Sequence, residues 1–171
     1  MGFKDFLNDL LNSKSSMDPG FLKARERAFD TKISDLSDID ADSIDNIFGA
    51  VVDMGMSSSV SSLFCFRNGK TDLYDSNGHA TLNLGQKYGD VNSAVKNFIK
   101  SAERTAVSLE PVREYPFPGE GQTNIYLIGR MGVYKTTYEI NRPSTQTQSD
   151  KYLNTLLRDV MTKIRVRLQR S

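Results

Sequence analysis

The longest regular pattern in the sequence is a series of apolar residues between Asp90 and Leu109. Their spacing places them on one side of an α-helix, while the charged residues of the segment fall on the other side. Pro111 follows and ends the helix. The apolar positions are Val91, Ala94, Val95, Phe98, Ile99, Ala102, Ala106 and Leu109. Such a stripe has to be buried, so we expect this helix to cover one side of a core.

Short strands precede this helix. Leu63 to Phe66 is a continuous apolar run, and Asn68-Gly69 after it is a turn typical of β-hairpins. Thr71 to Ser76 is then the returning strand. A second pair, Asn77-Gly78, precedes Ala80 to Leu84, where apolar and polar residues alternate. The region predicts a hairpin, with or without a short third strand.

Further strands follow the helix. Any strand within Val112 to Gly121 must be short and lie at a sheet edge, because Pro116 and Pro118 cannot donate hydrogen bonds to a neighbour. Asn124 to Gly129 and Val133 to Ile140 predict two strands joined by a glycine-containing turn.

A last helix follows the polar loop 141–149, with Ser149 or Asp150 as its cap. Its apolar face consists of Leu153, Leu156, Leu157, Val160, Met161, Ile164 and Leu168.

Helical spacing also occurs in the first third of the chain. A helix is predicted from Ser43 to about Met54, with Ile44, Ile47, Phe48, Val51 and Val52 on one side. A second is predicted from Phe21 to Phe29. A short amphipathic helix near the N-terminus would carry Phe3, Phe6, Leu7, Leu10 and Leu11.

These elements predict an α/β (α+β) fold. We expect a five-stranded, mostly antiparallel sheet with helices packed on its faces, plus a helical N-terminal extension. The predicted division is a helical extension and acidic linker over residues 1–40 and one α/β domain over residues 41–171.

From residue 43 onward the element order resembles the roadblock and longin group of profilin-like domains, whose pattern is helix, two strands, helix, three strands, helix. The resemblance lies in element order alone. It implies a non-catalytic platform that binds GTPases, motors or scaffold proteins and often forms dimers. Pro116 and Pro118 fall where roadblock-like dimers join, and they argue against edge-to-edge pairing of a homodimer here.

Composition gives little support for catalysis or for a cofactor. The chain has one cysteine, Cys65, and one histidine, His79, which leaves no metal-ligand or redox motif. Cys65 belongs to an apolar run and His79 to a turn, so we do not expect them to form a catalytic pair. The glycines match no phosphate-binding motif. We therefore expect no enzyme activity, no catalytic residues, no cofactor and no metal.

The net charge of +1 comes from 22 basic and 21 acidic residues and gives no general reason to expect nucleic acid or a membrane as partner. No targeting signal or membrane-spanning run is evident. We expect a cytoplasmic protein of bacterial type with another protein as its partner.

The charges are nevertheless unevenly distributed. Residues 30–45 contain six aspartates and one lysine, whereas residues 151–171 contain six basic residues and one aspartate. The two stretches could dock on each other or form two interaction surfaces. The candidate interaction residues are Asp35, Asp38, Asp40, Lys163, Arg165, Arg167 and Arg170.

Three functions fit these observations. The first is a protein-protein interaction module. The second is an immunity or antitoxin-like inhibitor whose acidic stretch binds a basic toxin. The third is a small-molecule sensor that uses polar aromatic residues of the predicted strands and turns, namely Tyr74, His79, Tyr126 and Tyr134.

Overall fold

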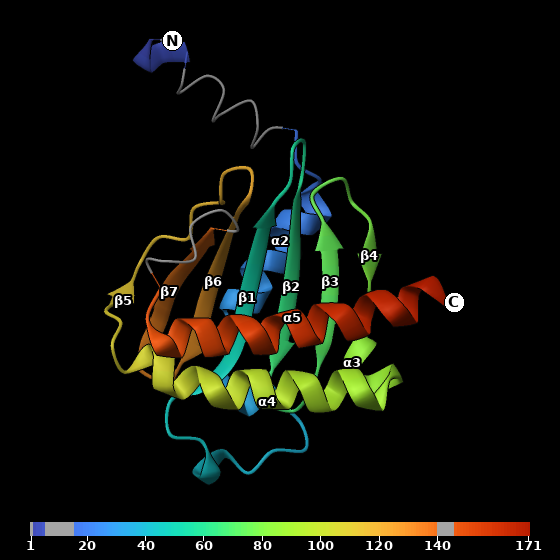
Figure 1. The fold of residues 1–171 in the computed structure, drawn as a ribbon, viewed down its shortest axis with the longest axis vertical. Coiled ribbons are helices and arrows are strands. Elements are labelled where there is room, and N and C mark those ends of the chain that lie inside the picture. Colours follow the sequence, from blue (N-terminus) through green and yellow to red (C-terminus); the bar gives the residue numbers. More distant parts are fainter. Residues whose placement is uncertain (1, 6–15, 140–145) are drawn as a thin grey trace.

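The computed structural model describes residues 2–5, 16–139 and 146–171, and one antiparallel sheet of seven strands dominates it (Figure 1). The strand order is β4-β3-β2-β1-β6-β7-β5. The strands are β1 (Ile47–Gly55), β2 (Val60–Phe66), β3 (Thr71–Asp75), β4 (Ala80–Thr81), β5 (Pro111–Val112), β6 (Gln122–Gly129) and β7 (Gly132–Glu139). The α+β class is confirmed, but the predicted number of five strands is wrong.

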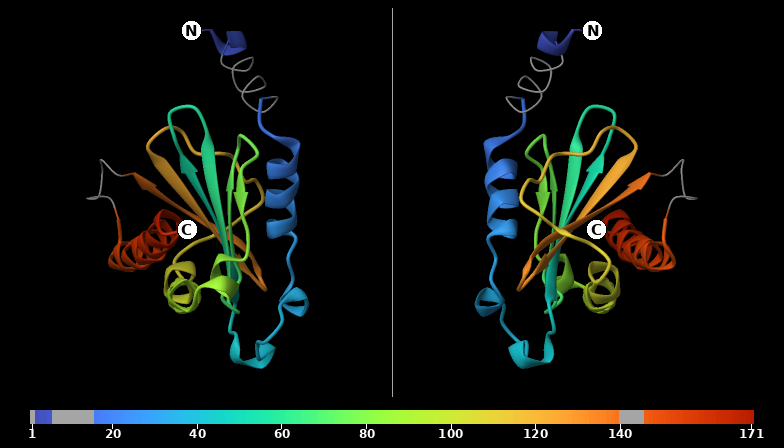
Figure 2. Two further views of the ribbon diagram at one scale, coloured as in Figure 1. Left: turned by 90° about the vertical axis from the view of Figure 1, so that its right-hand side faces the viewer. Right: turned by 90° about the vertical axis from the view of Figure 1, so that its left-hand side faces the viewer.

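The sheet has a helical layer on each face (Figure 2). One face carries α4 (Gly89–Ala106) and α5 (Gln148–Gln169), together with the short α3 (Leu84–Lys87). The opposite face carries α2 (Pro19–Phe29) and the segment that leads from α2 to β1. Both faces are apolar, because each helical layer closes its own core cluster of buried side chains.

The helix predicted over residues 43–54 is wrong, because most of this stretch is β1, the central strand. Ala50 and Val52 face α4 and α5, whereas Phe48 and Val51 face the α2 side. The register of β1 against β6 shifts between Ile47 and Gly49, so the simple alternation of a strand is broken there. A strand that is apolar on both faces and contains a bulge reproduces the spacing of an amphipathic helix.

β4 and β5 are both two-residue strands at the edges of the sheet, in the two regions where the sequence allows a short strand. β5 contains Pro111, and Pro116 and Pro118 lie beyond it in a loop rather than in a strand. At the other edge, β4 follows the Asn77-Gly78 turn, in which Gly78 has a φ of 99°. The turn at Gly69, with a φ of 87°, joins β2 to β3 as the sequence predicts.

The predicted helices other than 43–54 are confirmed where the structure describes them. Helix α4 buries the predicted apolar stripe, although Leu109 lies just beyond its end. Thr147, not Ser149 or Asp150, caps α5, and Asp150 completes the capping box. Of the N-terminal stripe, residues 3–5 are helical and the side chain of Phe3 is exposed, while residues 6–11 lie outside the described residues.

Helix α2 belongs to the core on its side of the sheet. Asp18 caps its start, and the side chain of Phe21 is only 1% exposed. Ala24 and Ala28 pack with strand residues of the second core cluster. Residues before position 40 therefore pack against strands that follow it, and the division of the chain at residue 40 stays a prediction.

Truncation of a side chain in the central strands tests this packing. Leu127 of β6 is fully buried, so Leu127→Ala is expected to lower the free energy of unfolding by about 2–5 kcal/mol. Leu82→Ala, at a leucine that is half exposed, serves as the control and is expected to change it by less than about 0.5 kcal/mol. Urea unfolding followed by circular dichroism measures both, and equal effects would contradict the burial of β6.

Candidate functional site

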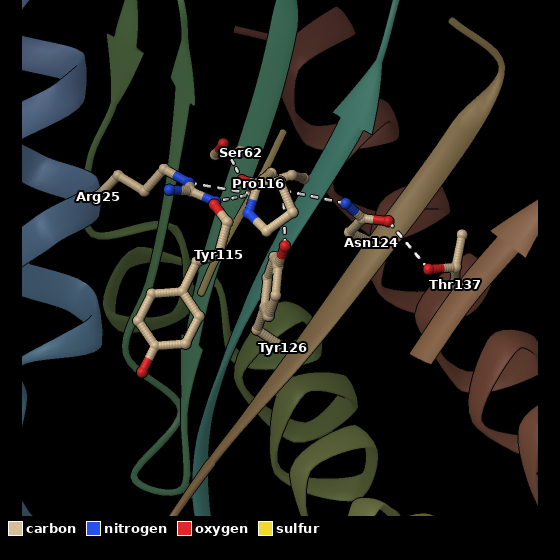
Figure 3. A network of polar contacts seen from close by, with 8 residues as sticks. Arg25, Ser62, Tyr115, Pro116, Asn124, Tyr126 and Thr137 are labelled. Carbon is tan, nitrogen blue, oxygen red and sulfur yellow. Dashed lines mark hydrogen bonds and ion pairs between the residues drawn. The ribbon is translucent and has the colours of Figure 1, made fainter. Parts of the chain in front are cut away.

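Two features of the described residues, one on each face of the sheet, are candidates for a functional site. The first is a buried network between α2 and the sheet (Figure 3). The Nε and Nη2 atoms of Arg25 donate to Asp53 Oδ2 at 3.0 and 2.6 Å, and Ser62 Oγ donates to the other oxygen, Asp53 Oδ1. Arg25 is 9% exposed and Asp53 is fully buried. The ion pair thus joins α2 to the central strand.

The same network holds the loop after β5. Arg25 Nη2 also donates to the carbonyl of Tyr115 at 2.8 Å, and the carbonyl of Pro116 accepts from Asn124 at 3.1 Å and from Tyr126 Oη at 2.6 Å. The ring of Phe117 lies 4.2 Å from the guanidinium carbon of Arg25. Burial raises the pKa of Tyr126 to about 12, and the negative charge of Asp53 adds to the rise.

This network is internally satisfied. Asn124 uses its carbonyl oxygen as well, since Thr137 Oγ1 donates to it at 3.0 Å (Figure 3). Because these polar groups already pair with one another, the network serves to attach α2 and the loop to the sheet rather than to receive a ligand.

The second feature is a groove on the opposite face, between α5 and the ends of the strands. Figure 1 shows that α4 and α5 cross the strands side by side over one half of the sheet and leave the other half uncovered. The groove follows this margin and has a volume of 790 Å³. Met54, Leu73, Thr123 and Tyr138 form its sheet side. We call this feature the α5 groove; the α5 residues that line it are Asn154, Leu157, Arg158, Met161, Thr162, Ile164, Arg165, Leu168 and Gln169.

One buried polar atom in the α5 groove has no partner. Asn154 is 7% exposed, and its Oδ1 atom accepts no hydrogen bond from any described residue. An unpaired buried acceptor costs about 1–3 kcal/mol of stability, so such groups are rare in folded proteins. Asn154 Oδ1 is therefore available to a hydrogen-bond donor that enters the groove.

Two cations border the same groove. Arg158 donates to the hydroxyl of Tyr138, and its guanidinium carbon lies 5.5 Å from the centre of the Tyr138 ring. Arg165 lies two helical turns further along α5. Both side chains are exposed, and no carboxylate among the described residues pairs with either.

The other predicted basic residues of α5 are used differently. Lys163 pairs with Asp159 on the same helix, and Arg167 pairs with Asp90 of α4 at 3.1 Å. The hydrogen bond from Arg167 holds the pKa of Asp90 below its usual value. Arg170 is the exposed residue that ends α5. Of the four basic candidates, only Arg165 lines the groove.

The structure does not show the acidic stretch docked on the basic helix, which is one of the two alternatives that the sequence leaves open. Asp35 and Asp40 lie in the segment that joins α2 to β1, which runs down the α2 side and then turns beneath the end of the sheet (Figure 2). They accept hydrogen bonds from nearby backbone amides, and Asp38 is in a left-handed conformation with a φ of 57°. Among the described residues, no ion pair joins an acidic candidate to a basic one.

The aromatic residues suggested for a sensor site do not come together either. Tyr126 faces the α2 side, whereas Tyr134 belongs to the core beneath α4 and α5. Tyr74 packs on Phe64, and His79 is exposed in a turn. Cys65 is fully buried, and burial raises the pKa of its thiol.

Comparisons with known proteins give no relative: no family model matches the chain, and no curated protein or solved structure matches it. Within the described part of the chain, no three His, Cys, Asp or Glu side chains are grouped so that they could hold a metal ion. Among the helices in that part, none has the length and apolar character needed to cross a membrane.

A double substitution tests the Arg25–Asp53 ion pair. Asp53→Leu leaves the guanidinium of Arg25 buried without its counter-charge, and we expect it to lower the free energy of unfolding by about 3–5 kcal/mol. Adding Arg25→Met removes that charge, so the double variant should be more stable than Asp53→Leu alone. Urea unfolding measures both, and a double variant that is less stable than the single one would contradict this role.

A second substitution tests the unpaired state of Asn154. Asn154→Leu removes the buried acceptor at similar volume, and we expect it to raise the free energy of unfolding by about 1–3 kcal/mol. Asn97→Leu, at an exposed position of α4, controls for the better helix propensity of leucine. An equal increase in the free energy of unfolding in the two variants would show that the burial of Asn154 does not destabilise the fold.

Proposed function

We propose that this chain is a non-catalytic binding module whose ligand occupies the α5 groove. The observation that carries the proposal is the unpaired, buried Oδ1 of Asn154 in an otherwise largely apolar groove. The volume of 790 Å³ lies within the range of about 300–1,000 Å³ found for sites that bind small molecules. Apolar walls with a few polar groups are also typical of such sites.

The chemistry of the lining favours binding. Its polar groups are the Asn154 amide, the hydroxyls of Thr123, Tyr138 and Thr162, the Gln169 amide and two guanidiniums. These groups orient a ligand through hydrogen bonds and charge. Met54, Leu73 and Met161 supply flexible apolar surface, and thioether side chains adapt well to the shape of a bound apolar group.

Protein binding, the function expected first from the sequence, is the second candidate. The length of the groove favours it, because its α5 side runs from Asn154 to Gln169, roughly 22 Å at the rise of an α-helix. A groove of this length accommodates a helical segment of a partner, laid with its apolar side on the groove.

A matched pair of variants tests the proposed site. Met161 lines the α5 groove, and Met131 is 78% exposed in the turn between β6 and β7. We expect Met161→Trp to fill the groove and weaken binding of Nile red, a neutral apolar dye, at least tenfold. Met131→Trp introduces the same side chain away from the groove and should leave binding unchanged.

Fluorescence titration measures the affinity, and circular dichroism checks that both variants are folded. The site would be contradicted if Nile red did not bind the wild-type chain, or if both variants bound it as the wild type does.

A further inference from the structure

We infer that the ligand of the α5 groove is an anionic amphiphile, with an apolar chain in the groove, an acidic head group at Arg158 and Arg165, and a hydrogen-bond donor near that head group. The inference rests on the proposed function, because it names the class of ligand for the same site. Three features of the groove carry it.

The first feature is the position of the two arginines. They are seven residues apart on α5, which places them two turns apart on the same side of the helix. Both line the α5 groove, so both guanidiniums border its opening. Guanidinium groups bind carboxylate and phosphate in a planar, bidentate manner. The edge of the groove formed by Arg158 and Arg165 is therefore suited to bind an acidic head group.

The second feature is the missing counter-charge. Arg25, Lys163 and Arg167 each have a carboxylate partner within the fold. Arg158 and Arg165 have none among the described residues, and the described lining of the groove contains no acidic side chain. A negative charge brought by a ligand would thus meet two cations and no competing anion.

The third feature is the place of Asn154 relative to Arg158. The two residues are four positions apart, which makes them neighbours on the surface of α5. Asn154 is buried, Arg158 is exposed and both line the groove, so a single ligand in the groove can contact both. A hydroxyl or amide N–H at that point would donate to the unpaired Oδ1.

Beyond these polar groups the groove is apolar. Leu157, Met161 and Leu168 line it from α5, and Met54 and Leu73 line it from the sheet. An alkyl chain placed there would be transferred from water into apolar surroundings, and each methylene group that is buried strengthens binding.

Calorimetric titration with four probes of equal chain length tests the inference: 3-hydroxydodecanoate, dodecanoate, 1-dodecanol and dodecyltrimethylammonium, each below its critical micelle concentration. We expect 3-hydroxydodecanoate to bind several-fold more tightly than dodecanoate. Both anions should bind at least tenfold more tightly than the alcohol, and the cation should bind most weakly.

Variants assign these differences to residues. Arg158→Gln combined with Arg165→Gln should weaken binding of dodecanoate at least tenfold and leave 1-dodecanol unchanged. Asn154→Leu should abolish the preference for the 3-hydroxy acid. Arg170→Gln is the control, because Arg170 is an exposed cation of the same helix that does not line the groove.

The outcomes separate this inference from the proposed function. Equal affinity for the anion and the alcohol, or no loss in the double arginine variant, would overturn the anionic ligand and leave the groove as a binding site. Binding of dodecanoate and 3-hydroxydodecanoate with equal affinity would overturn the role of Asn154. If none of the four probes binds and Nile red does not bind either, both the inference and the proposed function fail.

Discussion

The structure depends on the burial of nearly the whole of its central strand. β1 pairs with β2 on one side and with β6 on the other, and apolar side chains leave it toward both faces of the sheet. A strand of this kind is stable only when both faces are covered. The chain provides one cover from its second half, α4 with α5, and the other from its first third, α2 with the segment that follows it (Figure 2).

The two covers are attached by different means. The α4 and α5 layer packs through apolar side chains, with Glu103 of α4 accepting from the amide of Ile47, whereas α2 adds the buried pair of Arg25 and Asp53. A buried ion pair adds little net stability compared with apolar residues of similar size, but its two side chains are paired only when the elements that carry them lie in one relative position. We interpret the pair as the contact that sets the position of α2 on the sheet. Its guanidinium and the Pro116 carbonyl also fix the loop after β5.

The sequence predicts well those elements whose stability is local. The stripe of α4 and the Asn68-Gly69 turn require only neighbours in the chain, and both are present. β1 was missed because a doubly buried strand with a bulge has no alternation to recognise. The site was missed because it joins α5 to strand residues far away in sequence.

Some signals of these features were nevertheless present. Asp53 interrupts the apolar run of β1, and Arg25 lies at helical spacing from Phe21 and Ala28, on the buried side of α2. Asn154 lies beside Leu153 and Leu157 on the apolar side of α5. A polar residue inside an apolar pattern indicates a buried partner or a ligand, but the sequence alone does not identify which of the two applies.

The two helical layers leave different parts of the sheet accessible. On the α2 face the polar network around Arg25 is internally hydrogen-bonded, while α5 leaves a margin of the other face open. The most direct test is a nitrogen–proton correlation spectrum of the full chain titrated with dodecanoate. We expect shifts confined to the α5 groove, including those of the side-chain amide of Asn154 and the backbone amides of Arg158 and Met161. Binding at the α5 groove would be contradicted if these signals stayed unchanged while signals of residues on the α2 face shifted.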